Sequence, residues 1–257
     1  MRSYTKRTRA VAGLSALALA GSGLFVSSAL AGGKDAKSEH WGVVERNTIG
    51  SPVAALRDGP YVISKSTNTV SAPPFGKGSL GIEVGSSTEK MGFGDEVDFV
   101  GDAVADLNQA GFYVYQTGED TGYGGDSNLP NIQIEINPHV ANKTYTSMVF
   151  VPNGSNVTPD EWSGYIDGTD PTQGYWYFSN SSVATATGCT QAGSCTSLQA
   201  ALDGLATAND GTGPATILAI SVAKGRDAQF QGAVDGLRIN DRTYDFEADG
   251  VHAKGAK

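Results

Sequence analysis

The stretch 231–247 constrains the fold of this chain more than any other part of it. Two runs of apolar residues flank a short polar turn at Asn240-Asp241. Such a pattern is typical of a hairpin that closes an antiparallel sheet. The apolar residues of the two runs are Val234, Leu237, Ile239, Tyr244 and Phe246.

Short β-like runs separated by Gly, Asn, Asp and Pro recur along most of the chain, without an internal repeat. Their number and spacing predict an all-β, antiparallel sandwich. The expected strands are 41–46, 79–84, 96–100, 111–117, 131–137, 147–151, 175–178, 216–223, 230–239 and 242–247.

The closing sequence Val-Asp-Gly-Leu-Arg-Ile (234–239), followed by Tyr-Asp-Phe-Glu (244–247), resembles the final strands of concanavalin A-like domains. This is the laminin G and glucanase-type superfamily. The resemblance implies a jelly-roll sandwich. Because that fold hosts lectins, glycanases, lyases and structural modules, it does not by itself assign a function.

A second resemblance covers most of the chain after residue 40. The segments that carry it are similar to those of a group of exported bacterial proteins without an assigned role, so they imply export and a jelly roll but no catalytic residues. They are 41–44, 47–53, 76–82, 112–118 and 131–137.

The N-terminus has the pattern of an export signal. Four basic residues among the first nine precede an apolar run, 11–30, and Ala29-Leu30-Ala31 supplies small residues for cleavage after Ala31. We therefore expect residues 1–31 to be a signal peptide. A retained membrane anchor is the alternative, although several Gly and Ser residues make the run a poor span.

Removal of the signal leaves 226 residues and moves the formal net charge from −9 to −13. We expect a single domain, the jelly-roll sandwich (41–248), between a flexible leader (32–40) and a flexible tail (249–257). The predicted location is secreted or in the cell envelope, with no membrane span after cleavage. The negative charge argues against nucleic acid as a partner.

The two cysteines, Cys189 and Cys195, lie in a Gly- and Thr-rich segment. Outside the cytoplasm they are expected to form a disulfide that staples a small loop. Free thiols and metal ligation are the alternatives, and the absence of further Cys or His nearby in the sequence disfavours the second.

One segment has helical rather than β periodicity. Leu198, Ala201, Leu202 and Leu205 recur at spacings of three and four, and Ser197 or Thr196 can cap the start, so we expect one short accessory helix. A weaker helical turn is expected at 103–108.

The strand 131–137 presents the most informative polar residues. Alternation places three isoleucines on one face and Gln133, Glu135 and Asn137 on the other. In a glycosidase, Glu135 would need a second carboxyl across a cleft, and Glu83 or Asp98 could supply it. Glucanase-type jelly rolls carry an acid-x-Asp-x-acid series here, and Gln133 and Asn137 depart from it. A solvated sheet face is the alternative for each of these acids.

Aromatic rings give a second indication of sugar binding, since flat rings stack on sugar faces. Tyr123, Tyr165 and Trp176 are the predicted ligand contacts, in addition to the polar ladder. Tyr175 and Tyr177 share one face of their strand and Trp176 takes the other, so at least one of these two sets should belong to the core.

No cofactor is expected, with bound Ca²⁺ as the alternative, because oxygen ligands are abundant. Asp120 and Asp126 flank a Gly-rich loop, and Asp235 lies in the closing strand. None of them follows the spacing of an EF-hand loop.

The sequence contains no Gly-x-Ser-x-Gly elbow, no His-Glu-x-x-His pair and no phosphate-binding loop. The preferred hypothesis is a non-catalytic binding module for an extracellular carbohydrate or envelope component. The alternatives are a glycoside hydrolase or polysaccharide lyase that uses Glu135, and a structural or adhesive envelope protein.

Overall fold

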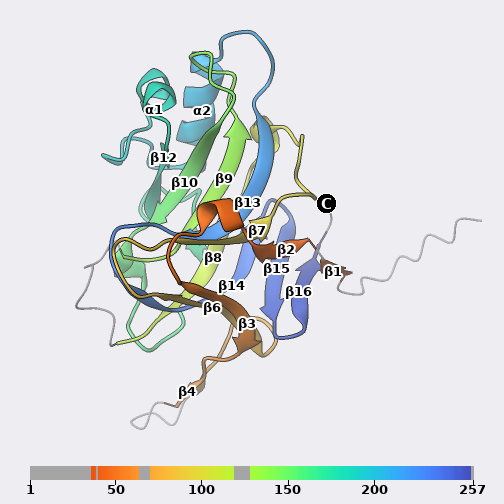
Figure 1. Ribbon diagram of the computed structural model, residues 1–257, viewed down its shortest axis with the longest axis vertical. Coiled ribbons are helices and arrows are strands. Elements are labelled where there is room, and N and C mark those ends of the chain that lie inside the picture. The colour runs from red at the N-terminus through yellow and green to blue at the C-terminus, as the bar shows by residue number, and fades with distance from the viewer. Residues whose placement is uncertain (1–35, 39, 64–69, 119–127, 256–257) are drawn as a thin grey trace, which may run out of the picture. The chain divides into compact units, whose positions relative to one another are not determined.

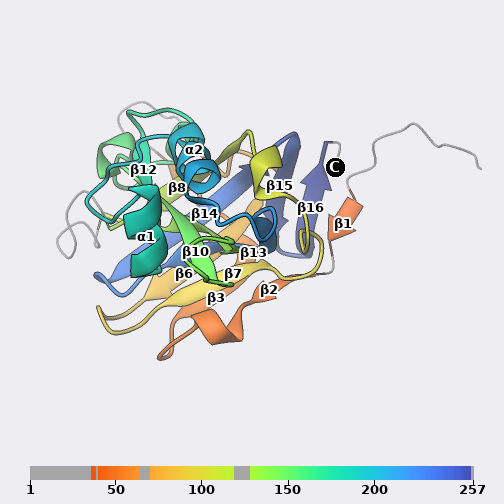
Figure 2. The ribbon, with the colours of Figure 1, turned by 90° about the horizontal axis from the view of Figure 1, so that it is seen from above.

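The computed structural model describes residues 36–38, 40–63, 70–118 and 128–255. The predicted signal peptide lies outside these residues. Two antiparallel sheets form a sandwich-like fold around one apolar core (Figures 1 and 2). All described elements belong to one unit, Gly33–Lys257. No helix among the described residues is long and apolar enough to cross a membrane.

Sheet A has eight strands, in which β14 occupies the centre. It pairs with β6 along its first half, with β15 along its second half, and with β8 on both sides of a bulge. The strands are β1 (Ala36–Ser38), β3 (Val53–Asp58), β6 (Gly78–Val84), β8 (Ala110–Gln116), β11 (Ile166–Asp167), β14 (Phe230–Ile239), β15 (Arg242–Glu247) and β16 (Gly250–Lys254).

Sheet B has six strands in the spatial order β12-β10-β9-β13-β7-β2. A separate two-stranded ribbon joins β4 (Val62–Ile63) and β5 (Val70–Ser71). The strands of sheet B are β12 (Gly174–Phe178), β10 (Thr146–Pro152), β9 (Asn131–Asn137), β13 (Thr216–Lys224), β7 (Met91–Asp95) and β2 (Trp41–Val43).

The closing hairpin is confirmed. Strands β14 and β15 pair antiparallel across a turn at Asn240-Asp241. Val234 and Leu237 are both fully buried although they are three residues apart, because the register of β14 shifts between Asp235 and Arg238. Gly236 has a positive φ of 58° in this bulge, and a Cβ there would lie 2.5 Å from the Phe75 ring. The position therefore requires glycine.

The predicted disulfide between Cys189 and Cys195 is also confirmed. Its loop follows the free edge of β12, where the N–H of Trp176 donates to the carbonyl of Cys195 at 2.7 Å and that of Phe178 donates to Cys189 at 3.1 Å. The disulfide loop thus pairs with backbone groups of β12 that would otherwise lack partners at the edge of sheet B.

The predicted helix forms α2 (Leu198–Ala208), and Ser197 caps it by accepting from the N–H of Ala200. The expectation of one accessory helix is wrong, since α1 (Ser181–Thr187) precedes it, and both helices contact β12 (Figure 1). Asn180 caps α1 through its side chain, and Gly188 ends it at a φ of 76°. Helix α1 is only seven residues long and contains one large apolar residue, so its periodicity was too weak to detect.

The expected strand 96–100 is wrong, because β7 ends at Asp95. The Asp95 carboxylate accepts hydrogen bonds from the N–H groups of Val97 and Asp98, both at 2.8 Å, and these bonds turn the chain. The expected strand 41–46 is shorter, because the 3₁₀ helix η1 (Glu45–Asn47) follows β2. The helical turn expected at 103–108 corresponds to η2 (Val104–Asp106).

Both expected flexible ends contain strands. Residues 250–254 of the tail form β16, which pairs with β15, and 36–38 of the leader form β1, which pairs with β16. Alternation in the tail segment is short and flanked by Gly, so only its pairing with β15 shows it to be a strand.

Candidate functional site

The outward face of β9 carries the predicted polar ladder. Ile132, Ile134 and Ile136 are fully buried in the core, and the intervening side chains of Gln133, Glu135 and Asn137 take the opposite face, as alternation predicts. Glu135 nevertheless has only 1% of its surface exposed. The alternative of a freely solvated acid is therefore wrong for this residue.

Four donors converge on the Glu135 carboxylate. Its Oε1 accepts from Asn47 Nδ2 at 2.6 Å, from the Tyr145 hydroxyl at 2.8 Å and from Gln133 Nε2 at 3.3 Å. Its Oε2 accepts from the guanidinium of Arg46. Burial alone would raise the pKa of Glu135, but the hydrogen bonds from Arg46, Asn47 and Tyr145 together hold that pKa below its ordinary value.

The donors come from distant parts of the chain. After β2, the helix η1 brings Arg46 and Asn47 to the outward side of sheet B, and Arg46 also pairs with Glu96. Gly92 on β7 leaves room for this approach, since a Cβ there would lie 3.1 Å from the Cβ of Asn47. Sequence reasoning missed Arg46 and Asn47 because only the pairing of β2 with β7 brings η1 to this face of sheet B. It missed Tyr145, which precedes β10, because only the pairing of β10 with β9 brings it to Glu135.

The predicted catalytic pairs do not assemble around Glu135. Glu83 lies on β6 in sheet A, exposed and on the face opposite the core residues Leu80 and Ile82, so it points away from sheet B. Asp98 belongs to a different group, in which it contacts His40 at 2.7 Å. A general acid also needs a raised pKa, whereas that of Glu135 is lowered.

The predicted ring contacts are separated as well. Trp176 is completely buried, and its indole N–H donates to the carbonyl of Gly168 at 2.7 Å, so its assignment as a ligand contact is wrong. Tyr165 contacts the Tyr113 ring beside sheet A, and its hydroxyl accepts from Gln109. Tyr123 lies outside the described residues.

The outward face of β12 instead carries Tyr175 and Tyr177, which we call the tyrosine strip. The two rings are half-buried, with centroids 6.3 Å apart and planes inclined by 37°. Tyr177 is in register with Val149 of β10, and Val149 is in register with Gln133 of β9. The strip and the polar ladder therefore share one face of sheet B, two strands apart.

A pocket of about 310 Å³ opens beside the strip. Tyr175 forms one wall, and Asn153 and Thr172 contribute polar groups. Alternation within β12 placed the two tyrosines on one face. Only the buried position of Trp176 shows that this face is the outward one.

The predicted calcium ligands are only partly described. Asp120 and Asp126 lie outside the described residues. Asp235 is fully buried, and its two oxygens accept from the N–H groups of Phe75 at 3.0 Å and Phe246 at 3.1 Å. Burial is the main cause that raises the pKa of Asp235 to about 7. Within the described part of the chain, Asp235 does not belong to a group of three or more His, Cys, Asp or Glu side chains arranged to hold an ion.

A cavity of about 730 Å³ lies between η2 and α2. Leu107, Leu202 and Leu205 form its apolar walls, and Asp106 and Asp203 lie among its polar groups. None of the described residues that line it is aromatic. It therefore offers no surface on which a sugar could stack.

Comparison with known proteins adds no further assignment: no protein-family model, no curated protein and no solved structure matches the chain.

Proposed function

We propose that the chain is an exported, non-catalytic module that binds an extracellular carbohydrate on the outward face of sheet B. The tyrosine strip carries this proposal. Two half-buried rings on one outward face, beside a pocket with polar walls, combine the stacking surface and the hydrogen-bonding groups that sugar recognition needs.

Several features support the export and the jelly-roll fold that this proposal includes. The Cys189–Cys195 disulfide is typical of proteins that fold outside the cytoplasm. The basic and apolar pattern of residues 1–31 favours export to the medium or the cell envelope. The two-sheet core and the closing β14–β15 hairpin are compatible with a concanavalin A-like jelly roll, which we propose as the finer description of the fold.

The environment of Glu135 favours binding over hydrolysis. Its carboxylate is saturated by donors and its pKa is lowered, so it is poorly suited to protonate a leaving group. In the proposed module it holds η1 against sheet B and orders Gln133 and Tyr145 at the edge of the binding face.

Replacement of the strip tests the proposal. In Tyr175→Ala and Tyr177→Ala, retention on an array of neutral and acidic oligosaccharides should fall by about tenfold for each ring that stacks. Tyr165→Ala, which alters a ring beside sheet A, is the matched control and should bind as the unmodified protein does. Melting temperatures separate lost binding from lost folding.

The other outcomes assign the other functions. Absence of binding to every glycan on the array overturns the carbohydrate proposal and favours a structural envelope protein. Release of reducing sugar that Glu135→Gln abolishes would contradict the non-catalytic assignment.

A further inference from the structure

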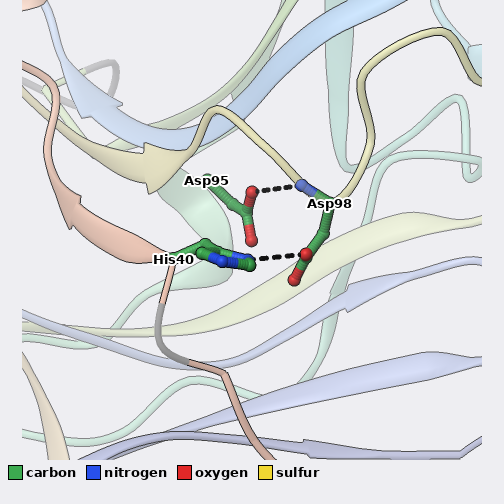
Figure 3. Close-up of side chains that lie close together, drawn as sticks. All are labelled: His40, Asp95 and Asp98. Carbon is green, nitrogen blue, oxygen red and sulfur yellow. Dashed lines mark hydrogen bonds and ion pairs between the residues drawn. The ribbon is translucent and has the colours of Figure 1, made fainter.

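We propose that His40, Asp95 and Asp98 form a binding site for one divalent transition-metal ion at the β2–β7 edge of sheet B. The three side chains converge in Figure 3, and one potential ligand atom from each lies within 4.8 Å of the other two. The site is separate from the tyrosine strip and does not depend on the proposed carbohydrate function.

Asp95 gives the strongest reason to expect an ion. Its side chain is fully buried, and its Oδ1 accepts from the N–H groups of Val97 and Asp98. Its Oδ2 has no hydrogen-bond partner among the described residues, and Figure 3 shows this oxygen directed toward His40 and the Asp98 carboxylate. A buried carboxylate oxygen without a donor is costly, and a bound cation would satisfy it.

The fold fixes all three groups in place. Trp41 of β2 is in register with Asp95 of β7, so His40 arrives at the same end of the strand pair. The turn that Asp95 itself caps then places Asp98 opposite the imidazole, with His40 Nδ1 2.7 Å from Asp98 Oδ1. An ion would replace the proton between these two atoms and leave the other imidazole nitrogen protonated.

The surroundings of the two acids favour a cation. The ring of Trp41 packs 4.9 Å from that of Tyr244, which is itself buried. The two carboxylates lie in one cluster, Asp95 fully buried, and a dication bound between them would reduce their mutual repulsion.

The ligand set indicates the class of ion. Ca²⁺ and Mg²⁺ prefer oxygen ligands, whereas imidazole nitrogen suits Zn²⁺ and the other late divalent ions of the first transition series. Three protein ligands leave at least one position on the ion for water. The His40 side chain is 47% exposed, so solvent can reach the site.

Titration calorimetry of the purified protein, without a histidine tag and after treatment with chelator, tests the site with ZnCl₂. One Zn²⁺ should bind per chain, and the melting temperature should rise on binding. His40→Ala and Asp98→Asn should each weaken binding by about tenfold or more, because loss of an outer-shell partner alone costs about 10–100-fold.

Two further variants distinguish loss of a metal ligand from loss of folding and from binding at another histidine. Asp95→Asn keeps an oxygen for the two N–H groups of the turn, so it should fold and yet lose the Zn²⁺-induced rise in melting temperature. His252→Ala is the matched control, because His252 pairs with the carboxylate of Asp249 at 3.0 Å and, within the described part of the chain, belongs to no group of three potential metal ligands. It should bind Zn²⁺ unchanged.

The site is refuted if the unmodified protein binds no Zn²⁺ at a 1:1 ratio, or if His40→Ala binds as tightly as the unmodified protein. Equal loss of binding in His252→Ala would also place the ion elsewhere. Ca²⁺ that competes as well as Zn²⁺ would overturn the assignment to transition metals.

Discussion

Glu135 and Asp95 are both buried carboxylates in sheet B, but their surroundings differ. Side chains from four residues donate to Glu135, and both of its oxygens accept. Asp95 accepts two backbone N–H groups on one oxygen and, within the described part of the chain, none on the other. Burial raises the pKa in both places, yet the pKa of Glu135 is lowered overall and that of Asp95 is raised.

The comparison shows that depth alone does not decide the charge of a buried acid. At Glu135 the hydrogen bonds from Arg46, Asn47 and Tyr145, with the charge of Arg46, outweigh the desolvation cost, whereas the two backbone N–H groups at Asp95 do not. Both oxygens of the Glu135 carboxylate thus have hydrogen-bond donors within the fold. One oxygen of Asp95 has no hydrogen-bond donor among the described residues, and the metal proposal rests on that oxygen.

The largest effect on stability should come from removing the Glu135 carboxylate. Glu135→Ala leaves Asn47 and Tyr145 without this acceptor and removes one of the two carboxylates that pair with Arg46, so we expect a loss of about 2–3 kcal/mol in the free energy of unfolding. Urea denaturation followed by fluorescence measures it. Glu83→Ala, which removes an exposed acid from sheet A, should change stability by less than about 0.5 kcal/mol. Similar losses in the two variants would contradict the role assigned to the four donors.

A smaller effect should separate two substitutions at Asp95. Asp95→Ala removes both hydrogen bonds of the turn and should cost about 1–2 kcal/mol. Asp95→Asn retains an oxygen for those bonds and replaces only the oxygen without a partner, so its cost should be below about 1 kcal/mol. The same denaturation experiment, in the presence of chelator, compares them. If Asn and Ala destabilise equally, the turn bonds are not what Asp95 contributes in the metal-free protein.

The finest test concerns the sign of the pH dependence rather than the size of an effect. The lowered pKa of Glu135 stabilises the fold above its ordinary value of 4.5, so the advantage of the unmodified protein over Glu135→Gln should shrink as the pH falls below that value. The raised pKa of Asp95 acts oppositely. As the pH rises from its ordinary value of 3.8, the unmodified protein should lose stability relative to Asp95→Asn.

Chelator-treated protein and both variants, unfolded in urea from pH 3 to pH 8, provide the measurement. Parallel curves for the two variants would contradict the opposite pKa shifts of Glu135 and Asp95.

Local pattern was sufficient for several features that depend on neighbours in the chain. Alternation in β9 placed Gln133, Glu135 and Asn137 on one face, and the spacing of apolar residues located α2. The presence of only two cysteines predicted the disulfide. The turn after Asp95 also depends on neighbouring residues, but the alternation of polar and apolar residues in 96–100 predicted a strand instead. The sequence does not distinguish an Asp that accepts from the backbone of a turn from an Asp within a strand.

The amino-acid pattern alone thus located many of the strands, among them β6, β8, β9, β10 and the β14–β15 hairpin, and the bridge between Cys189 and Cys195, but not β3 or β7. Only the tertiary structure decided which face of β12 is outward, which donors surround Glu135 and that His40 lies beside Asp98. Strand pairing joins residues that are 58 to 89 positions apart, and the free energy that selects one pairing comes from burying whole sheet faces, which no local pattern contains.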